Sequence, residues 1–534
     1  MDKDNTQSRL TRSAGVVGIA NMCSRVLGLV RVAVLAHFLE AKTALDAYYA
    51  AFTIPNLFRD LFGEGILSKA FVTTFAEVEA RSGKEAAWRL TNLVFNAVVI
   101  ILAVITILGI IASPFIVKVM VRGEGFDTVV SKEEEYGITD KRGLTVYLTR
   151  IMFPYLMLVS LAAICMGLLN SKDKFAVPAS ASAFFNVGSV VFGTTGFYLF
   201  PRLGLHPATG FAVGVLVGGV MQFGIQIPSV YRVGFRYKPV LSFTDPDLIR
   251  VMRLIAPAIL GNAALQINVF FNRFFASQGE GWLAWNTLAF RMMHLPIGVM
   301  GSAISTATLP VLSRFVARDS MDEFKDAFSY SLRMMIILVL PASIGLMVLN
   351  KPVISLFQRG QFGPDDTVMA AGSLFFYAFG LCGYAGRQIA TDGFIALKNM
   401  RVPVIISLFT ISLNILLNYI FIFHAGIDHR SLAISTACSI TINFFLLLIL
   451  LRRRVGSFGG RRILSTFIRS LIAAGIMGFV VFVIFRYTSL LIGSKLALLL
   501  SFLVALPVYY ACCMLVKLDE IKPVTILIMR KIKR

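Results

Sequence analysis

Positively charged side chains interrupt several of the most apolar stretches of this chain. Arg25 and Arg31 lie within the apolar sequence SRVLGLVRVAVLAHFL, residues 24–39, and Arg59 and Arg291 lie in later apolar runs. A guanidinium group is permanently charged, and its planar fork of donors fits the oxygens of a phosphate or a carboxylate. The chemistry that these residues can do is therefore the binding of an anion in an apolar environment.

A lipid-facing position does not explain these charges. An arginine or aspartate at the centre of a membrane helix costs about 2.5–3.5 kcal/mol on insertion scales. The arginines in apolar runs, which also include Arg150, Arg273 and Arg387, outnumber the neighbouring carboxylates Asp46, Asp60 and Glu64. This excess predicts a water-filled cavity that accepts an anionic substrate. For any single arginine, an ion pair between helices or a position near a helix end is an equal alternative.

The spacing of Arg25 and Arg31 restricts their arrangement. Six residues at about 100° each place the two side chains about 120° apart around a helix, so they cannot share a narrow stripe. Both could border a wide cavity, or one could line it while the other pairs with Asp46, Asp60 or Glu64. We expect Arg31 to be the stronger substrate contact and Arg25 to serve partly in holding helices together.

The composition places these residues in an integral membrane protein. Of 534 residues, 57% are hydrophobic and only 15% are charged, far from the usual composition of a soluble domain. The net charge of +22 would suggest nucleic-acid binding in a soluble protein. Here the bases form short clusters between apolar runs, which the positive-inside rule explains, so we expect no nucleic-acid partner.

About fourteen spans are predicted, because a spanning helix needs about 20 mostly apolar residues. The second, near 46–76, and the eighth, near 282–314, are the least uniform because both contain proline, glycine and charge. The first is interpreted as a transmembrane helix and not as a cleaved signal peptide. The predicted centres lie near residues 26, 58, 103, 157, 188, 218, 264, 299, 338, 380, 413, 440, 474 and 504.

Loop charges predict the orientation. If the N-terminus is cytoplasmic, the basic segments 81–89, 172–174, 232–238 and 452–462 all fall on the inner side, as does the C-terminal tail. The outer loops are poorer in bases or balanced by acids, as in 122–143. We therefore expect both termini to be cytoplasmic.

An internal repeat predicts the organisation of the chain. SPFIVKVMVRGEGFD, residues 113–127, resembles NKPVISLFQRGQFGPDD, residues 350–366. Because six helices restore the same orientation, this spacing favours two parallel six-helix lobes. The predicted divisions are 1–240 for helices 1–6, 241–455 for helices 7–12, and 456–534 for two further helices and a basic cytoplasmic tail.

Two further patterns concern packing and chemistry. Gly210, Gly214 and Gly218 share a spacing that permits close helix packing. The six cysteines lie in apolar runs, without a second CxxC motif or a histidine cluster, and are expected to be buried and unpaired. No GxxxxGK[ST], HExxH or GxSxG sequence occurs. We therefore expect no enzyme activity, no catalytic residue, no cofactor and no metal site.

Three segments together identify a family resemblance. SRVLGLVR (24–31), AAFTIPNLFRDLFGEGILSKAFV (50–72) and LAFRMMHLPIGVMGSAISTATLPVLS (288–313) resemble the MurJ (MviN) family of lipid II flippases, within the multidrug/oligosaccharidyl-lipid/polysaccharide exporter superfamily. The resemblance implies an all-α fold of fourteen membrane helices, with two lobes in a pseudo-two-fold arrangement around a central cationic cavity. It implies that helices 13 and 14 form a groove for the lipid tail.

The resemblance also implies the activity. The substrate is lipid II, the undecaprenyl-pyrophosphate-linked precursor of peptidoglycan, which is moved across the bacterial cytoplasmic membrane by alternating access. Besides lipid II, the partners are membrane lipids and proteins of cell-wall synthesis, and we expect a monomer. The cavity arginines fall on Arg25, Arg31, Arg59 and Arg291, and the motif acids fall on Asp46 and Glu64.

The chain departs from the family pattern at two arginines. Val32 stands where the family usually has an acid after Arg31, and Phe290 stands where many members have an acid before Arg291. Without these neighbouring acids, Arg31 and Arg291 are either freer to bind anions or held in a different position. Helix 7 also lacks the acid through which some relatives bind sodium and has only Asn262, Asn268 and Asn272. This disfavours sodium coupling, with the membrane potential as an alternative driving force.

Three other functions are weighed against the flippase. An exporter of another polyprenyl-linked glycan precursor is the nearest alternative. A drug or cation antiporter needs an acidic binding centre, which a basic interior does not supply. A glycosyltransferase would need a catalytic carboxylate at the outer face, for which Asp46 or Glu133–Glu135 are the available residues.

Overall fold

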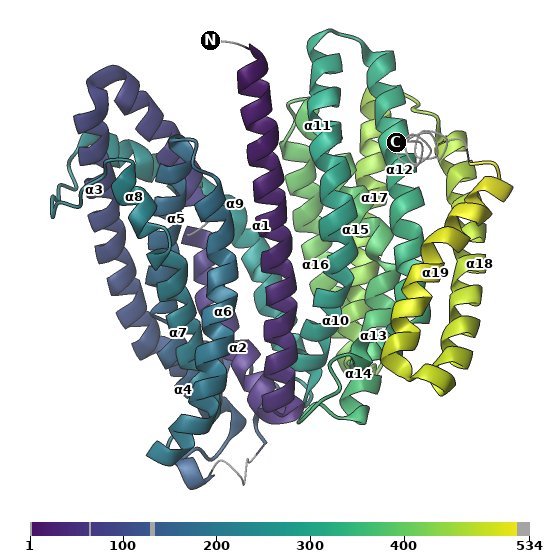
Figure 1. Cartoon of the computed structure of the whole chain (residues 1–534), viewed down its shortest axis with the longest axis horizontal. Coiled ribbons are helices and arrows are strands. Elements are labelled where there is room, and N and C mark those ends of the chain that lie inside the picture. Colours follow the sequence, from purple (N-terminus) through teal and green to yellow (C-terminus); the bar gives the residue numbers. More distant parts are fainter. Residues whose placement is uncertain (1–2, 63–65, 129–133, 519, 521–534) are drawn as a thin grey trace. The chain divides into compact units, whose positions relative to one another are not determined.

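The structure, a computed structural model, describes residues 3–62, 66–128, 134–518 and 520. Within these residues the predicted all-α fold is confirmed, because every long element is a helix. The chain forms two compact units, shown in Figure 1. Unit 1 comprises Met1–Ala284 with Gly360–Phe362, and unit 2 comprises Trp285–Arg359 with Gly363–Arg534. The two units are described separately below.

Unit 1 is built from the helices up to residue 276 (Figure 1). Apolar runs become helices because a backbone in lipid must satisfy its polar groups within one segment. The helices are α1 (Lys3–Phe38), α2 (Asp46–Phe62), α3 (Ile66–Met120), α4 (Lys141–Met152), α5 (Tyr155–Ser171), α6 (Ala176–Leu199), α7 (Ala208–Gly224), α8 (Ile227–Arg232) and α9 (Pro246–Ala276).

A sharp bend divides α3. Gly83 has φ 81° and ψ 178°, a conformation that side chains with a Cβ rarely adopt, so the helix changes direction there. The predicted second span, near 46–76, falls partly on α2 and partly on the start of α3. The predicted inner loop around residues 81–89 coincides with this bend and does not form an open loop.

Polar side chains at this end of unit 1 hold the segment that precedes α9. The Asn92 side chain accepts a hydrogen bond from the Lys238 backbone N–H at 2.7 Å, and Asn96 Nδ2 donates to the carbonyl oxygens of Lys238 and Val240. The Arg81 side chain pairs with Asp247 at 3.0 Å. The basic segments 81–89 and 232–238, both predicted for the inner side, therefore lie close together within unit 1.

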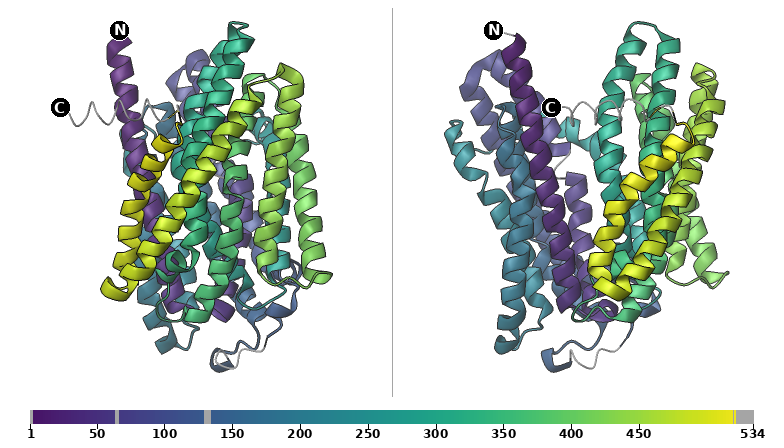
Figure 2. Two further views of the ribbon diagram at one scale, coloured as in Figure 1. Left: turned by 90° about the vertical axis from the view of Figure 1, so that its right-hand side faces the viewer. Right: turned by 45° about the vertical axis from the view of Figure 1, so that its right-hand side comes forward.

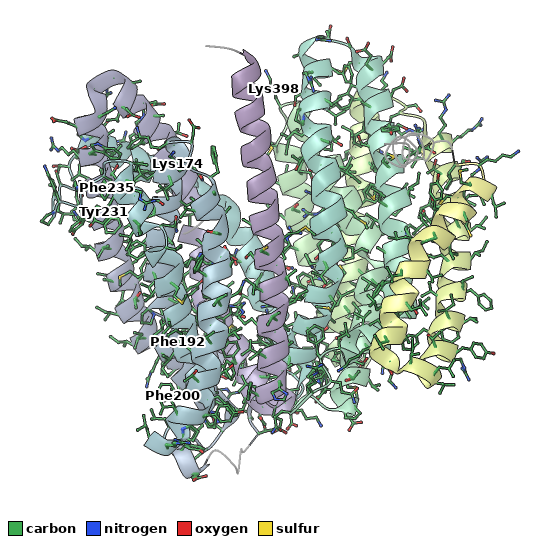
Figure 3. All side chains as sticks on the ribbon, viewed as in Figure 1. Lys174, Phe192, Phe200, Tyr231, Phe235 and Lys398 are labelled. Carbon is green, nitrogen blue, oxygen red and sulfur yellow. The ribbon has the colours of Figure 1, made fainter. Side chains whose placement is uncertain are left out.

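Labelled side chains show the same arrangement (Figure 3). Lys174, Tyr231 and Phe235 lie toward one end of unit 1, and Phe192 and Phe200 lie toward the other end. The loop at 172–174 and the segment from 231 to 235 thus share one end, as the predicted topology requires of two inner loops.

Unit 2 contains the remaining helices, which Figure 1 shows from teal to yellow. The chain enters it along α10, whose first turn belongs to unit 1. The helices are α10 (Trp282–Pro296), α11 (Ser302–Ala317), α12 (Met321–Val348), α13 (Asn350–Ser355), α14 (Pro364–Phe379), α15 (Leu381–Ala396), α16 (Arg401–Phe423), α17 (Arg430–Val455), α18 (Gly460–Ile492) and α19 (Ser494–Leu515).

The last two helices pack against each other and join unit 2 through α12 (Figure 2). The Tyr509 hydroxyl donates to the Ile337 carbonyl oxygen at 2.8 Å, linking α19 to α12. One turn earlier on α12, Arg333 pairs with Glu520 at 2.6 Å. Both polar contacts therefore attach the C-terminal end of α19 and the residues that follow it to the same part of α12.

Ten described helical segments are long and apolar enough to cross a membrane. They correspond to ten of the fourteen predicted spans, so the count of fourteen stays a prediction. The other four predicted spans are helical, and three of the helices concerned, α2, α10 and α11, are only 17, 15 and 16 residues long. The four spans are α1, α2, α9 and the α10–α11 pair, which hold Arg25, Arg31, Arg59, Arg273 and Arg291.

The cysteine prediction is partly wrong. Cys165, Cys512 and Cys513 are buried, but Cys382 and Cys438 are partly exposed and Cys23 is exposed. Cys23 lies beside Met22 on the face of α1 that unit 1 leaves uncovered, and Met22 is 61% exposed. An apolar neighbourhood in the sequence marks a membrane helix, and it does not decide which face of that helix is covered.

Glycines bring α6 and α7 into close contact, which confirms the packing predicted from their spacing. A Cβ placed on Gly214 would lie 2.7 Å from the Ser189 carbonyl oxygen, and one on Gly218 would lie 2.6 Å from the Phe185 carbonyl oxygen. Both neighbours are backbone atoms of α6, so they cannot rotate away. Side chains larger than hydrogen would force the two helices apart.

We predict that Gly214→Ala destabilises the protein by about 1–3 kcal/mol, the usual range for overpacking a close contact. Thermal unfolding of the detergent-solubilised protein measures the effect. Gly224→Ala is the matched control on the same helix, because no atom lies within 4 Å of a Cβ at that position. Equal melting temperatures for the two variants would show that the α6–α7 contact is not as restrictive as described.

Candidate functional site

Arg31 is enclosed by aromatic rings. Its side chain is 8% exposed, and its guanidinium carbon lies 5.4 Å from the Phe52 ring centroid and 4.9 Å from that of Phe185. The rings come from α2 and α6 and are nearly parallel to each other, at 15°. Cation–π contacts stabilise a cation that has lost water, so Arg31 joins three helices of unit 1.

Arg25 has the opposite environment. It is exposed, whereas the preceding residue faces α6, because Asn186 Nδ2 donates to the Ser24 carbonyl oxygen at 3.1 Å. The 120° separation inferred from the sequence therefore places Arg31 in a helix interface and Arg25 on an accessible face. This distribution differs from our expectation that Arg31 is the more available of the two.

Val32 is 1% exposed and packs in the interior of unit 1. A carboxylate at this position would be buried beside the aromatic rings that enclose Arg31. The chain has no acid here, and the rings of Phe52 and Phe185 lie against the cation.

Arg59 lies at the end of α2 next to an acid. Its Nη2 and Nε donate to Asp60 Oδ1 at 2.9 and 3.1 Å, and the two side chains are 29% and 44% exposed. An ion pair of this exposure contributes at most about 1 kcal/mol, so an anionic ligand could compete for Arg59. Glu64, the other predicted acid of this region, lies outside the described residues.

Asp46 forms the most enclosed ion pair of the described chain. Its Oδ2 accepts from Lys141 Nζ at 2.6 Å, and neither side chain has exposed surface. The same carboxylate accepts from the backbone N–H groups of Gly281 and Ala284, each at 2.7 Å. Lys141 Nζ also donates to the Gly125 carbonyl oxygen at 3.0 Å.

This geometry gives Asp46 a defined structural role. Ala284 lies in the first turn of α10, where N–H groups lack partners within the helix, so the carboxylate serves as the N-terminal cap of α10. Its negative charge also opposes the positive end of the helix dipole. Asp46 therefore fixes the start of the helix on which Arg291 lies seven residues later.

Lys141 is the residue that sequence reasoning missed. The sequence suggested Arg25 or Arg31 as possible ion-pair partners of Asp46. Its partner in the structure is instead Lys141, the first residue of α4, which is 95 residues away along the chain. The sequence offers Lys141 and Arg142 side by side, and Arg142 instead pairs with Asp127. No local pattern distinguishes the two, because the choice depends on which side chain the first turn of α4 directs inward.

Arg291 lies in unit 2, on the partly exposed side of α10. The preceding residue, Phe290, contacts the rings of His294 at 4.1 Å and Tyr377 at 5.4 Å between centroids. The position before Arg291 is therefore part of an aromatic cluster. The predicted arginines are divided between the units, with Arg25, Arg31 and Arg59 in unit 1 and Arg291 in unit 2.

The remaining arginines of the apolar runs also have identifiable surroundings. Arg150 of α4 donates from Nε to the Ser113 hydroxyl at 3.1 Å. Arg387 of α15 is partly exposed, and its Nε is enclosed without a hydrogen-bond acceptor among the described residues. No group of three or more histidine, cysteine, aspartate or glutamate side chains in the described residues is arranged to hold a metal ion.

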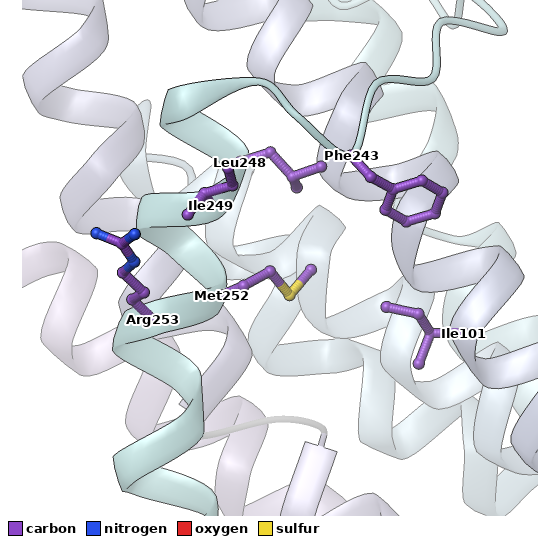
Figure 4. Close-up of a pocket in the computed structure, with 6 residues that line it drawn as sticks. All are labelled: Ile101, Phe243, Leu248, Ile249, Met252 and Arg253. Carbon is purple, nitrogen blue, oxygen red and sulfur yellow. The ribbon is translucent and has the colours of Figure 1, made fainter.

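A separate pocket of about 340 Å³ lies between α3 and α9 in unit 1 (Figure 4). Arg253 is its one charged wall residue among those described, and the others are apolar. The pocket supplies a hydrocarbon surface, without the several polar groups that a sugar or peptide would require. Its lining residues are Ile101, Phe243, Leu248, Ile249, Met252 and Arg253.

Breaking the Asp46–Lys141 pair from one side is predicted to be costly. Asp46→Asn and Lys141→Met should each destabilise the protein by about 3–5 kcal/mol, because each leaves an uncompensated buried charge or donor. Thermal unfolding of the purified variants measures this loss.

Asp127→Asn is the matched control, since Asp127 pairs with the adjacent Arg142 but is 54% exposed. It should cost no more than about 1 kcal/mol. The double variant of Asp46 and Lys141 should be more stable than the sum of the single losses predicts. Additive losses would mean that the two charges are not coupled.

Comparison with known proteins gives consistent similarities. The family described as lipid II flippase MurJ matches residues 35–502. The chain is 32% identical over 441 residues to the "Probable lipid II flippase MurJ" of Vibrio cholerae serotype O1, covering 82% of both chains. It is 31% identical over 451 residues to the lipid II flippase MurJ of Burkholderia cenocepacia, covering 83% of this chain and 84% of that one.

Solved structures agree with the sequence similarities. A lipid II flippase MurJ in an inward closed conformation matches with a TM-score of 0.74 and 25% identity, covering 95% of this chain and 99% of that chain. An inward-facing multidrug transporter of the MATE family matches with a TM-score of 0.67 and 16% identity, covering 82% of this chain and 96% of that chain. The second similarity concerns the fold alone.

Proposed function

The chain belongs to the lipid II flippase MurJ family, and from this membership we propose that it moves lipid II from the inner to the outer leaflet of the bacterial cytoplasmic membrane. The observation that carries the proposal is the similarity to a solved lipid II flippase along nearly the whole chain. The protein is a transporter and not an enzyme: it changes the position of its substrate and breaks no covalent bond.

The chemistry of the substrate suits the arginines of the family motifs. Lipid II joins an apolar polyprenyl tail to a pyrophosphate, and pyrophosphate oxygens bind guanidinium groups through paired charge-assisted hydrogen bonds. We assign this contact to Arg25, Arg59 and Arg291, which are exposed or partly exposed. The enclosure of Arg31 by Phe52 and Phe185 supports a role in shaping the wall on which Arg25 lies.

Transport proceeds by alternating access in this proposal. An inward-open central cavity between two lobes accepts the sugar and peptide part, the arginines hold the pyrophosphate, and the lobes reorient to release it outside. Asp46 acts as a structural residue that accepts hydrogen bonds at the start of α10. Each state must bind the pyrophosphate weakly enough for release.

The driving force in this proposal is the membrane potential. Asn268 and Asn272 of α9 are neutral, and the Asn272 side chain donates to the Asn268 side-chain oxygen at 2.9 Å. These amides lack the negative charge with which a carboxylate attracts sodium. A cationic interior, by contrast, responds directly to an electric field across the membrane.

Membrane orientation and partners complete the proposal. Both termini are cytoplasmic in this proposal, which rests on the alternation of basic and base-poor loops along the sequence. The protein acts as a monomer in contact with membrane lipids and with proteins of cell-wall synthesis. The nearest alternative is export of another polyprenyl-linked glycan precursor, which has the same pyrophosphate but a different sugar part.

We predict that this protein restores growth and lipid II flipping to a bacterium depleted of its own lipid II flippase. Failure to restore lipid II flipping at normal membrane levels would favour the alternative exporter. Polymerisation of lipid II by the purified protein would instead overturn the transporter assignment.

The same assay tests the arginines. Arg25→Ala and Arg291→Ala should each lower flipping roughly tenfold or more, since a hydrogen bond to a charged group contributes about 1.5–3 kcal/mol. Arg486→Ala is the control, an exposed arginine of α18 without an assigned role. Normal rescue by both variants at matched expression would remove the pyrophosphate role from these two arginines.

A further inference from the structure

An aromatic and cationic cluster lies between α10, α14 and α15 in unit 2, and its members are partly exposed except for the buried Tyr377 of α14. We call Phe290, His294, Tyr377, Tyr384 and Arg387 the α10–α15 cluster. The His294 ring lies 5.3 Å from the Tyr384 ring, and Phe290 lies 6.3 Å from Tyr384. Arg387 follows Tyr384 by three residues, so the two share a helix face.

Arg387 is the unusual member of this cluster. Its Nε is enclosed and has no hydrogen-bond acceptor among the described residues, although part of the side chain is accessible. No ion pair of Arg387 occurs in the described chain. Elsewhere in unit 2, Arg333 is similarly shielded but pairs with Glu520 at 2.6 Å.

The nearest acid along the same helix does not neutralise Arg387. Asp392 is five residues further on, which places it about 140° around α15. Its carboxylate is 6% exposed and accepts a hydrogen bond from the Ser305 hydroxyl of α11. Asp392 therefore faces a different neighbour.

Arg387 also lies inside Pro364–Ala396, a helical segment long and apolar enough to cross a membrane. Nine residues separate it from the last residue of α15, or about 13 Å along the helix. An arginine at such a depth is expected to face protein or water and to have a functional partner. The partly exposed guanidinium of Arg387 is therefore available to an anion that comes from outside the chain.

The neighbours of Arg387 are arranged to receive a polar ligand. His294 Nδ1 lies 2.9 Å from the Phe290 carbonyl oxygen, which can only accept, so Nδ1 donates and Nε2 is left for another group. Tyr384 interacts electrostatically with Arg387 and adds a hydroxyl to the same side. A guanidinium beside an imidazole and a phenol can bind an oxyanion and its adjacent hydroxyl groups.

We propose that Arg387 binds an oxyanion of the transported lipid-linked substrate, with His294 and Tyr384 positioning the adjoining polar groups. This inference rests on the proposed function. It adds a contact on α15 to those assigned to the arginines of the family motifs. The oxyanion is either a carboxylate of the peptide or a phosphoryl oxygen of the pyrophosphate, since a guanidinium fits both.

Binding measurements on the full-length protein in lipid nanodiscs test the proposal. The probes are lipid II, lipid II with its peptide carboxylates amidated, and undecaprenyl pyrophosphate. Arg387→Gln should weaken lipid II binding about tenfold, the loss expected for a charge-assisted hydrogen bond. Arg387→Lys should lose less, because it keeps the charge without the fork. Arg486→Gln, an exposed arginine of α18 in the same unit, should leave binding unchanged.

The probes distinguish the two sources of the oxyanion. If Arg387 binds a peptide carboxylate, Arg387→Gln weakens binding of lipid II but not of the amidated form or of undecaprenyl pyrophosphate. If Arg387 binds a phosphoryl oxygen, Arg387→Gln weakens the binding of all three probes by a similar factor. Unchanged binding of all three by Arg387→Gln overturns the proposal.

A measurement on the unmutated protein removes any dependence on the folding of the variants. An arginine-specific 1,2-dicarbonyl reagent, followed by peptide mass spectrometry, reports whether saturating lipid II protects Arg387. Protection is expected, and equal labelling with and without lipid II overturns the proposal. If the unmutated protein fails to bind lipid II at all, the proposed function itself fails, which is a separate outcome.

Discussion

The buried contact between Asp46 and Lys141 is the interaction on which the described architecture most depends. It joins α2, α4 and the start of α10, which are separated by 95 and 238 residues along the chain. A carboxylate without exposed surface is stable only where donors replace its lost water. Here one ammonium group and two backbone N–H groups provide those donors. The Asp46 carboxylate therefore holds the N-terminal end of α10, the helix that contains Arg291.

The other cations of the apolar helices also need partners that replace lost water. Arg31 is held between two aromatic rings, Arg59 is accompanied by the adjacent Asp60, and Arg150 donates to a serine hydroxyl. Arg387 has none of these arrangements among the described residues. A transporter of an anion needs some cations that are compensated by the protein and others that the substrate compensates.

Phe290 shows how a member of this family can change local chemistry while it keeps the motif arginine. The ring of Phe290 packs with His294, Tyr377 and Tyr384, where a carboxylate would have been close to Arg291 in sequence. The local balance of charge becomes more positive, and the surface beside Arg291 becomes aromatic.

The sequence by itself determined the class of the protein, its helical nature, the close approach of α6 and α7 and the family, because hydropathy, glycine spacing and motifs are local properties. It also indicated that Arg25 and Arg31 face different directions, since helix geometry alone sets that angle. Only the tertiary structure decided that Lys141 and not a motif arginine pairs with Asp46, that aromatic rings enclose Arg31, and that Phe290 joins Tyr384. These choices depend on contacts between residues far apart in the chain, and the pattern of residues around each partner does not encode which distant side chain will lie beside it.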